Sequence, residues 1–159
     1  MKKILHILTG TRFSGAENVA CQIITCFKND LNYQMVYSSP DGQIRDALME
    51  RNVRYVPMKE WSLSEVKRII REERPDIIHA HDMKASFFAA LLCGRIPLIS
   101  HVHNNNFDSR GISAKALLYR YAAQKANIHP YDDADTYRSF LMILIRERRI
   151  CFKDFIRYS

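Results

Sequence analysis

Blocks of apolar residues alternate with polar segments along residues 1–126, and their spacing predicts strands and helices in turn. A near-continuous apolar run at residues 4–8 is typical of a parallel strand that is covered on both faces. The next apolar positions repeat at the spacing of one helical face: Ala16, Val19, Ala20, Ile23, Ile24 and Phe27. Further strands are expected at residues 34–37, 53–56, 76–80 and 97–102. Further helices are expected at residues 44–49, 61–71 and 84–93, and after a capping Ser113.

This alternation predicts an α/β fold: a Rossmann-like, mostly parallel sheet with helices on both faces. Right-handed crossovers place the second and third strands on one side of the first strand, and the fourth and fifth strands on the other. In such sheets ligands bind at the carboxyl ends of the strands where the order reverses, here between the first and fourth strands. We therefore expect three loops to meet at this carboxyl edge: residues 10–15, 80–84 and 101–106.

Length, charge and cysteine usage narrow the class of protein. The chain has 159 residues, enough for one domain with a real core, and a formal net charge of +7. Such a charge favours an anionic partner, whereas no run of lysine and arginine is long enough to single out nucleic acid. The four cysteines lack metal-type spacing and are expected to be free thiols in a reducing cytosol. No signal peptide and no apolar run of the roughly 18 residues that span a membrane are recognisable, so a cytoplasmic protein is expected.

The first of the three loops has glycines at both ends, Gly10 and Gly15. Backbone N–H groups at the helix start that follows can face an anion or a sugar hydroxyl, with Arg12 as counter-charge. Neither common phosphate-loop pattern is present, so a tight turn that needs glycine is the structural alternative. Glu17 is a candidate functional carboxylate, but Ser14 and Glu17 also have the spacing of a capping box.

Two histidine pairs end the fourth and fifth expected strands. Residues two apart in a strand share a face, so His79 is expected inside the sheet and His81 at its edge, next to Asp82. In the same way His101 is expected in the core and His103 at the edge, followed by three amides at residues 104–106. Such an edge fits the recognition of sugar hydroxyls better than packing.

A metal site is the less favoured interpretation of these histidines. It would combine His81, Asp82, His101 and His103, which lie on two different strands. No third ligand spacing supports it, so no metal is expected.

Three segments, taken in order and placement, resemble the amino-terminal domain of GT-B glycosyltransferases of family four. They are residues 13–17 (FSGAE), 75–81 (PDIIHAH) and 97–104 (PLISHVHN), and the resemblance covers residues 1–126. It implies a single Rossmann-like domain of a GT-B enzyme. Members of the family transfer a sugar from a nucleotide-sugar to an acceptor, often saccharide or lipid-linked, with retention of configuration and no metal. No cofactor beyond the nucleotide-sugar substrate is implied.

The resemblance also implies roles for residues of the three loops. His103 corresponds to the histidine that approaches the donor sugar, and it is the one catalytic residue expected here. Ser14 and Gly15 correspond to the loop that lines the family's cleft. The remaining substrate-binding residues are expected mainly on the acceptor side: Gly10, Arg12, His81, Asp82, Asn104 and Asn105.

The chain departs from the family after residue 126. The family's carboxyl-terminal donor domain, with its Lys/Arg pair and two glutamates, has no counterpart here. Residues 127–159 form an atypical tail, in which an amphipathic helix could present Tyr137, Phe140, Leu141, Leu144 and Ile145. This tail could cover the surface left by the missing domain, result from a frame change or early stop, or, less favoured, lie on a membrane.

Three functions remain open from the sequence. The first is the acceptor-side half of a glycosyltransferase that is incomplete alone, and that either works with a separately encoded donor domain or is a remnant of a longer enzyme. The second is a non-catalytic module that binds a glycan or a nucleotide. The third is a fragment of a nucleotide-sugar epimerase. A cytoplasmic location is expected, with peripheral contact at the inner face of the membrane as a further option.

Overall fold

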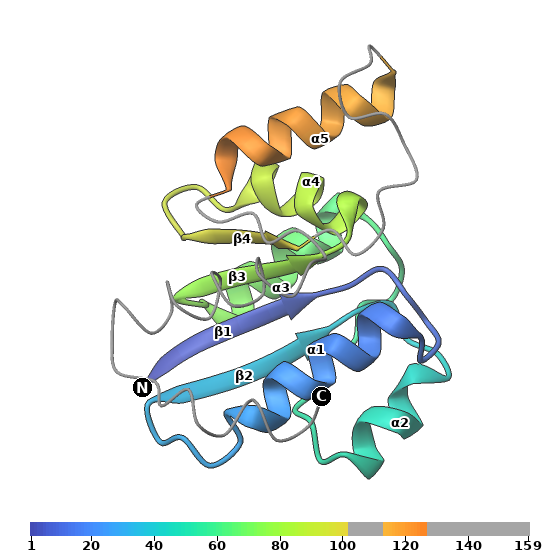
Figure 1. Cartoon of the computed structure of the whole chain (residues 1–159), viewed down its shortest axis with the longest axis vertical. Helices are drawn as coiled ribbons and strands as arrows, with labels where there is room; N and C mark the ends of the chain where they lie inside the picture. The colour runs from blue at the N-terminus through green and yellow to red at the C-terminus, as the bar shows by residue number, and fades with distance from the viewer. Residues whose placement is uncertain (102–112, 127–159) are drawn as a thin grey trace.

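The computed structural model describes residues 1–101 and 113–126 (Figure 1). Strands and helices follow one another along this part of the chain, as the hydrophobic pattern predicts. The strands are β1 (Lys2–Ile7), β2 (Tyr33–Ser38), β3 (Ile77–His81) and β4 (Leu98–His101). The helices are α1 (Gly15–Cys26), α2 (Ile44–Glu50), α3 (Leu63–Glu73), α4 (Met83–Leu92) and α5 (Ala114–Lys125).

The four strands form one parallel sheet in the order β2-β1-β3-β4. β1 therefore lies between β2 and β3, and the order reverses at the β1–β3 pair, as predicted. In this pair His6 is in register with His79 and Ile7 with Ala80. The α/β fold and the parallel sheet predicted from the sequence are confirmed.

The prediction of a regular strand at residues 53–56 is wrong. This segment lies beside β2, on the predicted side, but makes only the isolated bridges Tyr37–Tyr55 and Pro40–Met58. Tyr37 N–H donates to the Arg54 carbonyl, and Val56 N–H donates to the Tyr37 carbonyl. Between the two bridges the Val56 carbonyl accepts from the Ser38 hydroxyl, and the backbone pairing resumes where Met58 N–H donates to the Ser39 carbonyl. The pairing is therefore too short to count as a strand.

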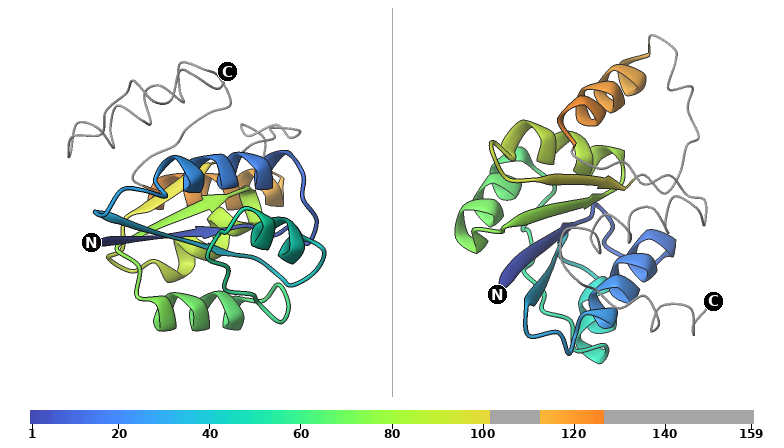
Figure 2. Two further views of the ribbon diagram at one scale, coloured as in Figure 1. Left: turned by 90° about the horizontal axis from the view of Figure 1, so that it is seen from below. Right: turned by 60° about the vertical axis from the view of Figure 1, so that its left-hand side comes forward.

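Helices cover both faces of the sheet (Figure 2). α1 and α2 pack on one face, where their buried residues join alternate positions of β1 and β2, among them Ile4, Leu8 and Tyr37. α3 and α4 pack on the opposite face against the intervening positions, among them Leu5 and Ile7. α5 packs against α4 and β4. The alternation of the two cores along β1 follows from the two-residue period of a strand.

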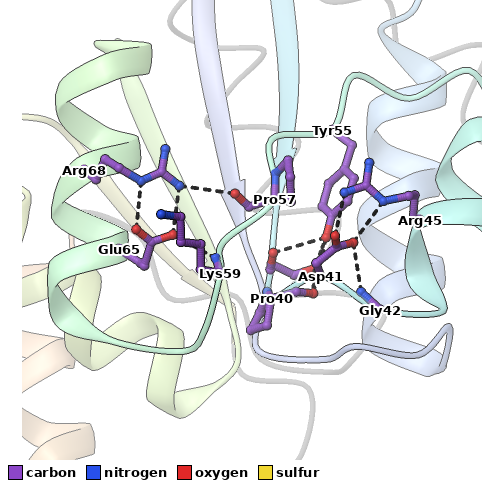
Figure 3. Close-up of polar contacts among 10 residues, drawn as sticks. Pro40, Asp41, Gly42, Arg45, Tyr55, Pro57, Lys59, Glu65 and Arg68 are labelled. Carbon is purple, nitrogen blue, oxygen red and sulfur yellow. Dashed lines mark hydrogen bonds and ion pairs between the residues drawn. The ribbon is translucent and has the colours of Figure 1, made fainter.

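Polar contacts fix the connections that follow β2 and the bridged segment (Figure 3). The Tyr55 hydroxyl donates to the carbonyls of Ser39 and Pro40. Ser62 caps α3 by accepting from the Glu65 N–H, and the Glu65 carboxylate accepts from Lys59 N–H and from Arg68. These hydrogen bonds, led by the one from Arg68, lower the pKa of Glu65 to about 2.

Within the described residues, no helix combines the length and apolar character needed to cross a lipid bilayer. The predicted boundary at residue 126 and the tail at residues 127–159 fall outside what the structure tests, since nothing beyond residue 126 is described.

Candidate functional site

The loop between β1 and α1 is shaped by a buried carboxylate, Glu17. This side chain is only 5% exposed, and the Ser14 hydroxyl donates to its Oε2 atom. A Cβ atom on Gly10 would overlap Glu17 Oε1, so Gly10 is required because the carboxylate occupies that space. Gly15 has no heavy atom within 4 Å of the corresponding position. The two glycines of the loop therefore have different roles.

The capping box expected for Ser14 and Glu17 is not formed. Ser14 is the residue at the amino-terminal cap of α1, but its side chain accepts no helical N–H. Its hydroxyl instead donates to the Glu17 carboxylate. The pair thus satisfies a buried carboxylate and fixes Ser14 against the first turn of α1.

Asp82 connects this first loop to the start of α4. Its Oδ2 atom accepts from the Thr9 hydroxyl at 2.6 Å and from the Thr9 N–H at 3.3 Å. Its Oδ1 atom accepts from the Ala85 N–H at 2.7 Å, which caps α4. Burial raises the pKa of Asp82, and the bonds from Ala85 and Thr9 oppose that rise. Asp82 is therefore a structural link across the β1–β3 junction.

The backbone of Asp82 is strained. Its φ of 143° and ψ of 170° lie in a region that is essentially reserved for glycine. A residue with a side chain persists there because the surrounding contacts, here those to Thr9 and Ala85, hold it. Such strain is concentrated at functional sites in proteins generally.

His81 is the last residue of β3 and so lies at the carboxyl end of that strand, as predicted, but its side chain is not exposed there. It is fully buried, and its Nε2 atom lies 3.0 Å from Nδ1 of His6. His79 and His101 are buried as expected, each 1% exposed. All four side chains lie on the α1 face, because His6 pairs with His79 and His81 pairs with His101 in the parallel register. Contact between His81 and a substrate stays a prediction, and this burial does not support it.

Burial lowers the pKa of His6 to about 3, so this imidazole is neutral at pH 7. Among the described residues, His6, His79 and His81 form the group whose ligand atoms could hold a metal ion. The metal ligands considered from the sequence were a different set, namely His81, Asp82, His101 and His103. Within that set, both Asp82 oxygens already accept hydrogen bonds from Thr9 and Ala85.

The structure brings part of the predicted site together. Gly10 and Ser14 both contact Glu17, while Arg12, Ser14 and Gly15 are exposed in the loop or at the start of α1. His103, Asn104 and Asn105 lie outside the described residues. The substrate-binding roles of all these residues, and the catalytic role of His103, stay predictions.

Sequence reasoning missed two residues that organise this edge. Thr9 carries no pattern of its own, and its role depends on a contact 73 positions away along the chain. His6 interrupts an apolar run, and that interruption is the one signal that could have marked it.

The fit between Gly10 and Glu17 predicts a non-additive pair of substitutions. Gly10→Ala should lower the free energy of unfolding by about 1–3 kcal/mol, because the new methyl group displaces the Glu17 carboxylate. In a Glu17→Ala background the same change should be nearly neutral. Urea unfolding of the two single variants and the double variant measures the coupling. Gly15→Ala is the matched control and should cost little, and equal costs for Gly10→Ala in both backgrounds would refute the proposed overlap.

The strained backbone at Asp82 predicts that Asp82→Gly lowers the free energy of unfolding less than Asp82→Ala does. Asp82→Ala loses the cap and the Thr9 bonds but keeps the unfavourable φ, so it should cost about 2 kcal/mol or more. Asp82→Gly loses the same bonds yet adopts this backbone freely, so it should cost about 1 kcal/mol less. Chemical denaturation of both variants decides the matter, and a glycine variant as unstable as the alanine variant would show that the backbone is not strained.

Comparison with known proteins agrees with this geometry at the level of fold. The crystal structure of Anabaena Alr3699/HepE in complex with UDP and glucose superposes with a TM-score of 0.70 at 16% identity, over 89% of this chain and 41% of that one. The lipopolysaccharide outer core galactosyltransferase WaaB gives 0.59 at 17% identity, over 89% and 42%. A UDP-N-acetylglucosamine 2-epimerase, described as putative, from Listeria monocytogenes gives 0.59 at 15% identity, over 90% and 42%.

The chain thus spans about two fifths of the length of these solved structures. Curated proteins yield no sequence match. The sequence model of Glycosyltransferase Family 4 matches residues 13–139, which is most of the chain and includes residues 13–15 of the first loop, Asp82 and the histidine segments at residues 79–81 and 101–103. The chain therefore belongs to glycosyltransferase family 4.

Proposed function

We propose that this chain supplies the acceptor-side half of a glycosyltransferase. In this proposal the complete enzyme transfers a sugar from a nucleotide-sugar to a saccharide or lipid-linked acceptor, and a donor domain that is not part of residues 1–126 completes the site. The observation that carries the proposal is the match of residues 13–139 to glycosyltransferase family 4. HepE, which has a similar fold, was crystallised with UDP and glucose, and this supports a nucleotide-sugar as donor.

The local structure supports a binding role for the first loop. Glu17 and Asp82 hold its two ends, through Ser14 and Thr9 respectively, so its backbone is fixed before a ligand arrives. A preorganised loop loses less conformational entropy on binding. Arg12, exposed within the loop, is then free to contact an anionic or hydroxyl-rich acceptor.

Catalysis in this proposal consists of orienting donor and acceptor and stabilising the charge that develops as the glycosidic bond breaks. His103 contributes a hydrogen bond to the donor sugar and does not act as a nucleophile. Gly10, Arg12, Asp82, Asn104 and Asn105 remain proposed acceptor-side contacts. Nothing in this role requires a metal or a cofactor other than the nucleotide-sugar.

The proposed place of action is the cytoplasm, with peripheral contact at the inner face of the membrane. The net charge of +7 supports attraction to an anionic lipid surface or to a lipid-linked acceptor. Binding to nucleic acid is not proposed, because the positive charge is spread along the chain.

A reconstitution assay tests the proposal. The full chain is incubated with radiolabelled UDP-sugars and a saccharide acceptor, alone and with a separately produced family 4 donor domain. We expect no transfer by the chain alone and measurable transfer by the combination. His103→Ala should lower kcat of the combination by about 100-fold, the cost of one transition-state hydrogen bond. His129→Ala, outside the three loops, is the control.

Each alternative outcome has a distinct meaning. Transfer by the chain alone would contradict the half-enzyme proposal, and an unchanged kcat for His103→Ala would reject the role of that residue. Saturable binding without transfer in any combination would indicate a binding module. Conversion of a free UDP-sugar without acceptor would indicate an epimerase fragment, which the fold of the Listeria protein keeps in consideration.

A further inference from the structure

Three histidines from β1 and β3 converge inside the protein, beneath α1. His6 and His81 are fully buried and His79 is 1% exposed. The ring centroids of His79 and His81 lie 3.9 Å apart, and His6 lies 5.0 Å and 5.2 Å from these two rings. Neighbouring positions on the same strands carry aliphatic side chains, such as Ile4 and Leu8 on β1. The three imidazoles are therefore a cluster of polar side chains within an otherwise aliphatic part of the core.

The spacing of these rings suits a metal ion. One ligand nitrogen from each ring lies within 4.8 Å of the other two, and His6 Nδ1 lies 3.0 Å from His81 Nε2. Zn–N bonds of about 2.0–2.1 Å in tetrahedral geometry place two ligand nitrogens about 3.3 Å apart. The observed separations bracket that value, so small rotations of the rings would bring three nitrogens to one ion.

The chemistry of the set narrows the class of ion. Neutral imidazole is a good ligand for Zn²⁺, Co²⁺, Ni²⁺ and Cu²⁺, whereas Mg²⁺ and Ca²⁺ prefer oxygen. His6 Nδ1 and His81 Nε2 share a hydrogen bond, and when both atoms bind the ion the proton of that bond moves to the other nitrogen of the same ring, so both imidazoles stay neutral. The two strands that carry the ligands are hydrogen-bonded neighbours, which fixes the distances between the three side chains.

We propose that His6, His79 and His81 form a binding site for one divalent transition-metal ion of the zinc class, with a structural role. The site is independent of the proposed glycosyl transfer, since its three side chains lie under the surface. Because the three side chains are buried, the metal ion enters the site while the chain folds. An ion that binds only the folded chain raises its stability in proportion to the logarithm of the free metal concentration.

Cobalt provides the direct test, because tetrahedral Co²⁺ absorbs visible light. The full chain carrying Cys26→Ser, which removes an exposed thiol, is refolded from urea with EDTA and then with increasing CoCl₂. We expect one Co²⁺ per chain with visible absorption bands. The Tm should rise by about 5 °C or more at free cobalt about 100-fold above the dissociation constant.

Single substitutions His6→Gln, His79→Gln and His81→Gln should each abolish the bands. His101→Gln is the matched control, because His101 is a buried histidine on the same sheet face whose ring lies 5.4 Å from that of His81, outside the three-ligand group. Bands that survive all three substitutions, or that disappear only with His101→Gln, would overturn the assignment. No cobalt uptake and no shift in Tm would overturn the proposal itself.

X-ray absorption of the zinc-loaded wild-type chain keeps the test independent of whether the variants fold. The expected spectrum shows imidazole nitrogens and no sulfur in the first coordination shell of the zinc ion. A first shell containing sulfur would assign the metal to cysteines and contradict the histidine site.

Discussion

The carboxylate of Asp82 joins the elements on which the candidate site depends. It accepts from the Thr9 hydroxyl and N–H at the end of β1, and it caps α4 through the Ala85 N–H. These bonds are possible because the sheet order places β1 beside β3, so the carboxyl ends of the two strands are adjacent. The strained backbone of Asp82 shows that the contacts outweigh a local conformational cost. They join the loop that begins at Gly10 to the start of α4.

The buried carboxylate of Glu17 also fixes the conformation of this loop. Glu17 accepts from Ser14 and fills the space beside Gly10, so the loop is held at both ends by acidic side chains. This explains how a short loop without either phosphate-loop pattern can be rigid. The loop can then present Arg12 and backbone groups in a fixed arrangement to an acceptor, which is the role proposed for it within glycosyltransferase family 4.

Much of the fold follows from the sequence, because burial of side chains leaves a periodic trace. The apolar run of β1 and the helical face of α1 were both predictable in this way. The segment at residues 53–56 has the composition of a strand, yet its pairing with β2 is limited to isolated bridges, and between them the Val56 carbonyl accepts from the Ser38 side chain and not from a backbone N–H. Periodicity reports which residues are buried and says little about how far a backbone pairing continues.

The site was less predictable than the fold, because polar pairing inside a protein depends on contacts between distant residues. The pairing of Thr9 with Asp82 and of His6 with His81 follows from strand order and register, which no local pattern records. His81 was placed at the edge because it ends its strand. It does end β3, but its side chain is buried on the α1 face, beside His79 and in register with His101 on β4. Glu17 could be noticed from its spacing to Ser14, but the spacing suggested the wrong hydrogen bond.

A double-mutant cycle between Thr9 and Asp82 tests directly whether the Asp82 carboxylate holds the first loop to the β3–α4 junction. Thr9→Val removes the hydroxyl at nearly constant volume, and Asp82→Ala removes the carboxylate. Urea unfolding of the wild-type chain, both single variants and the double variant at pH 7 gives the coupling free energy. The account predicts a favourable coupling of about 1–2 kcal/mol, as expected for a hydrogen bond to a charged, largely buried group. A coupling within error of zero would contradict the claim that Asp82 holds the first loop to the β3–α4 junction.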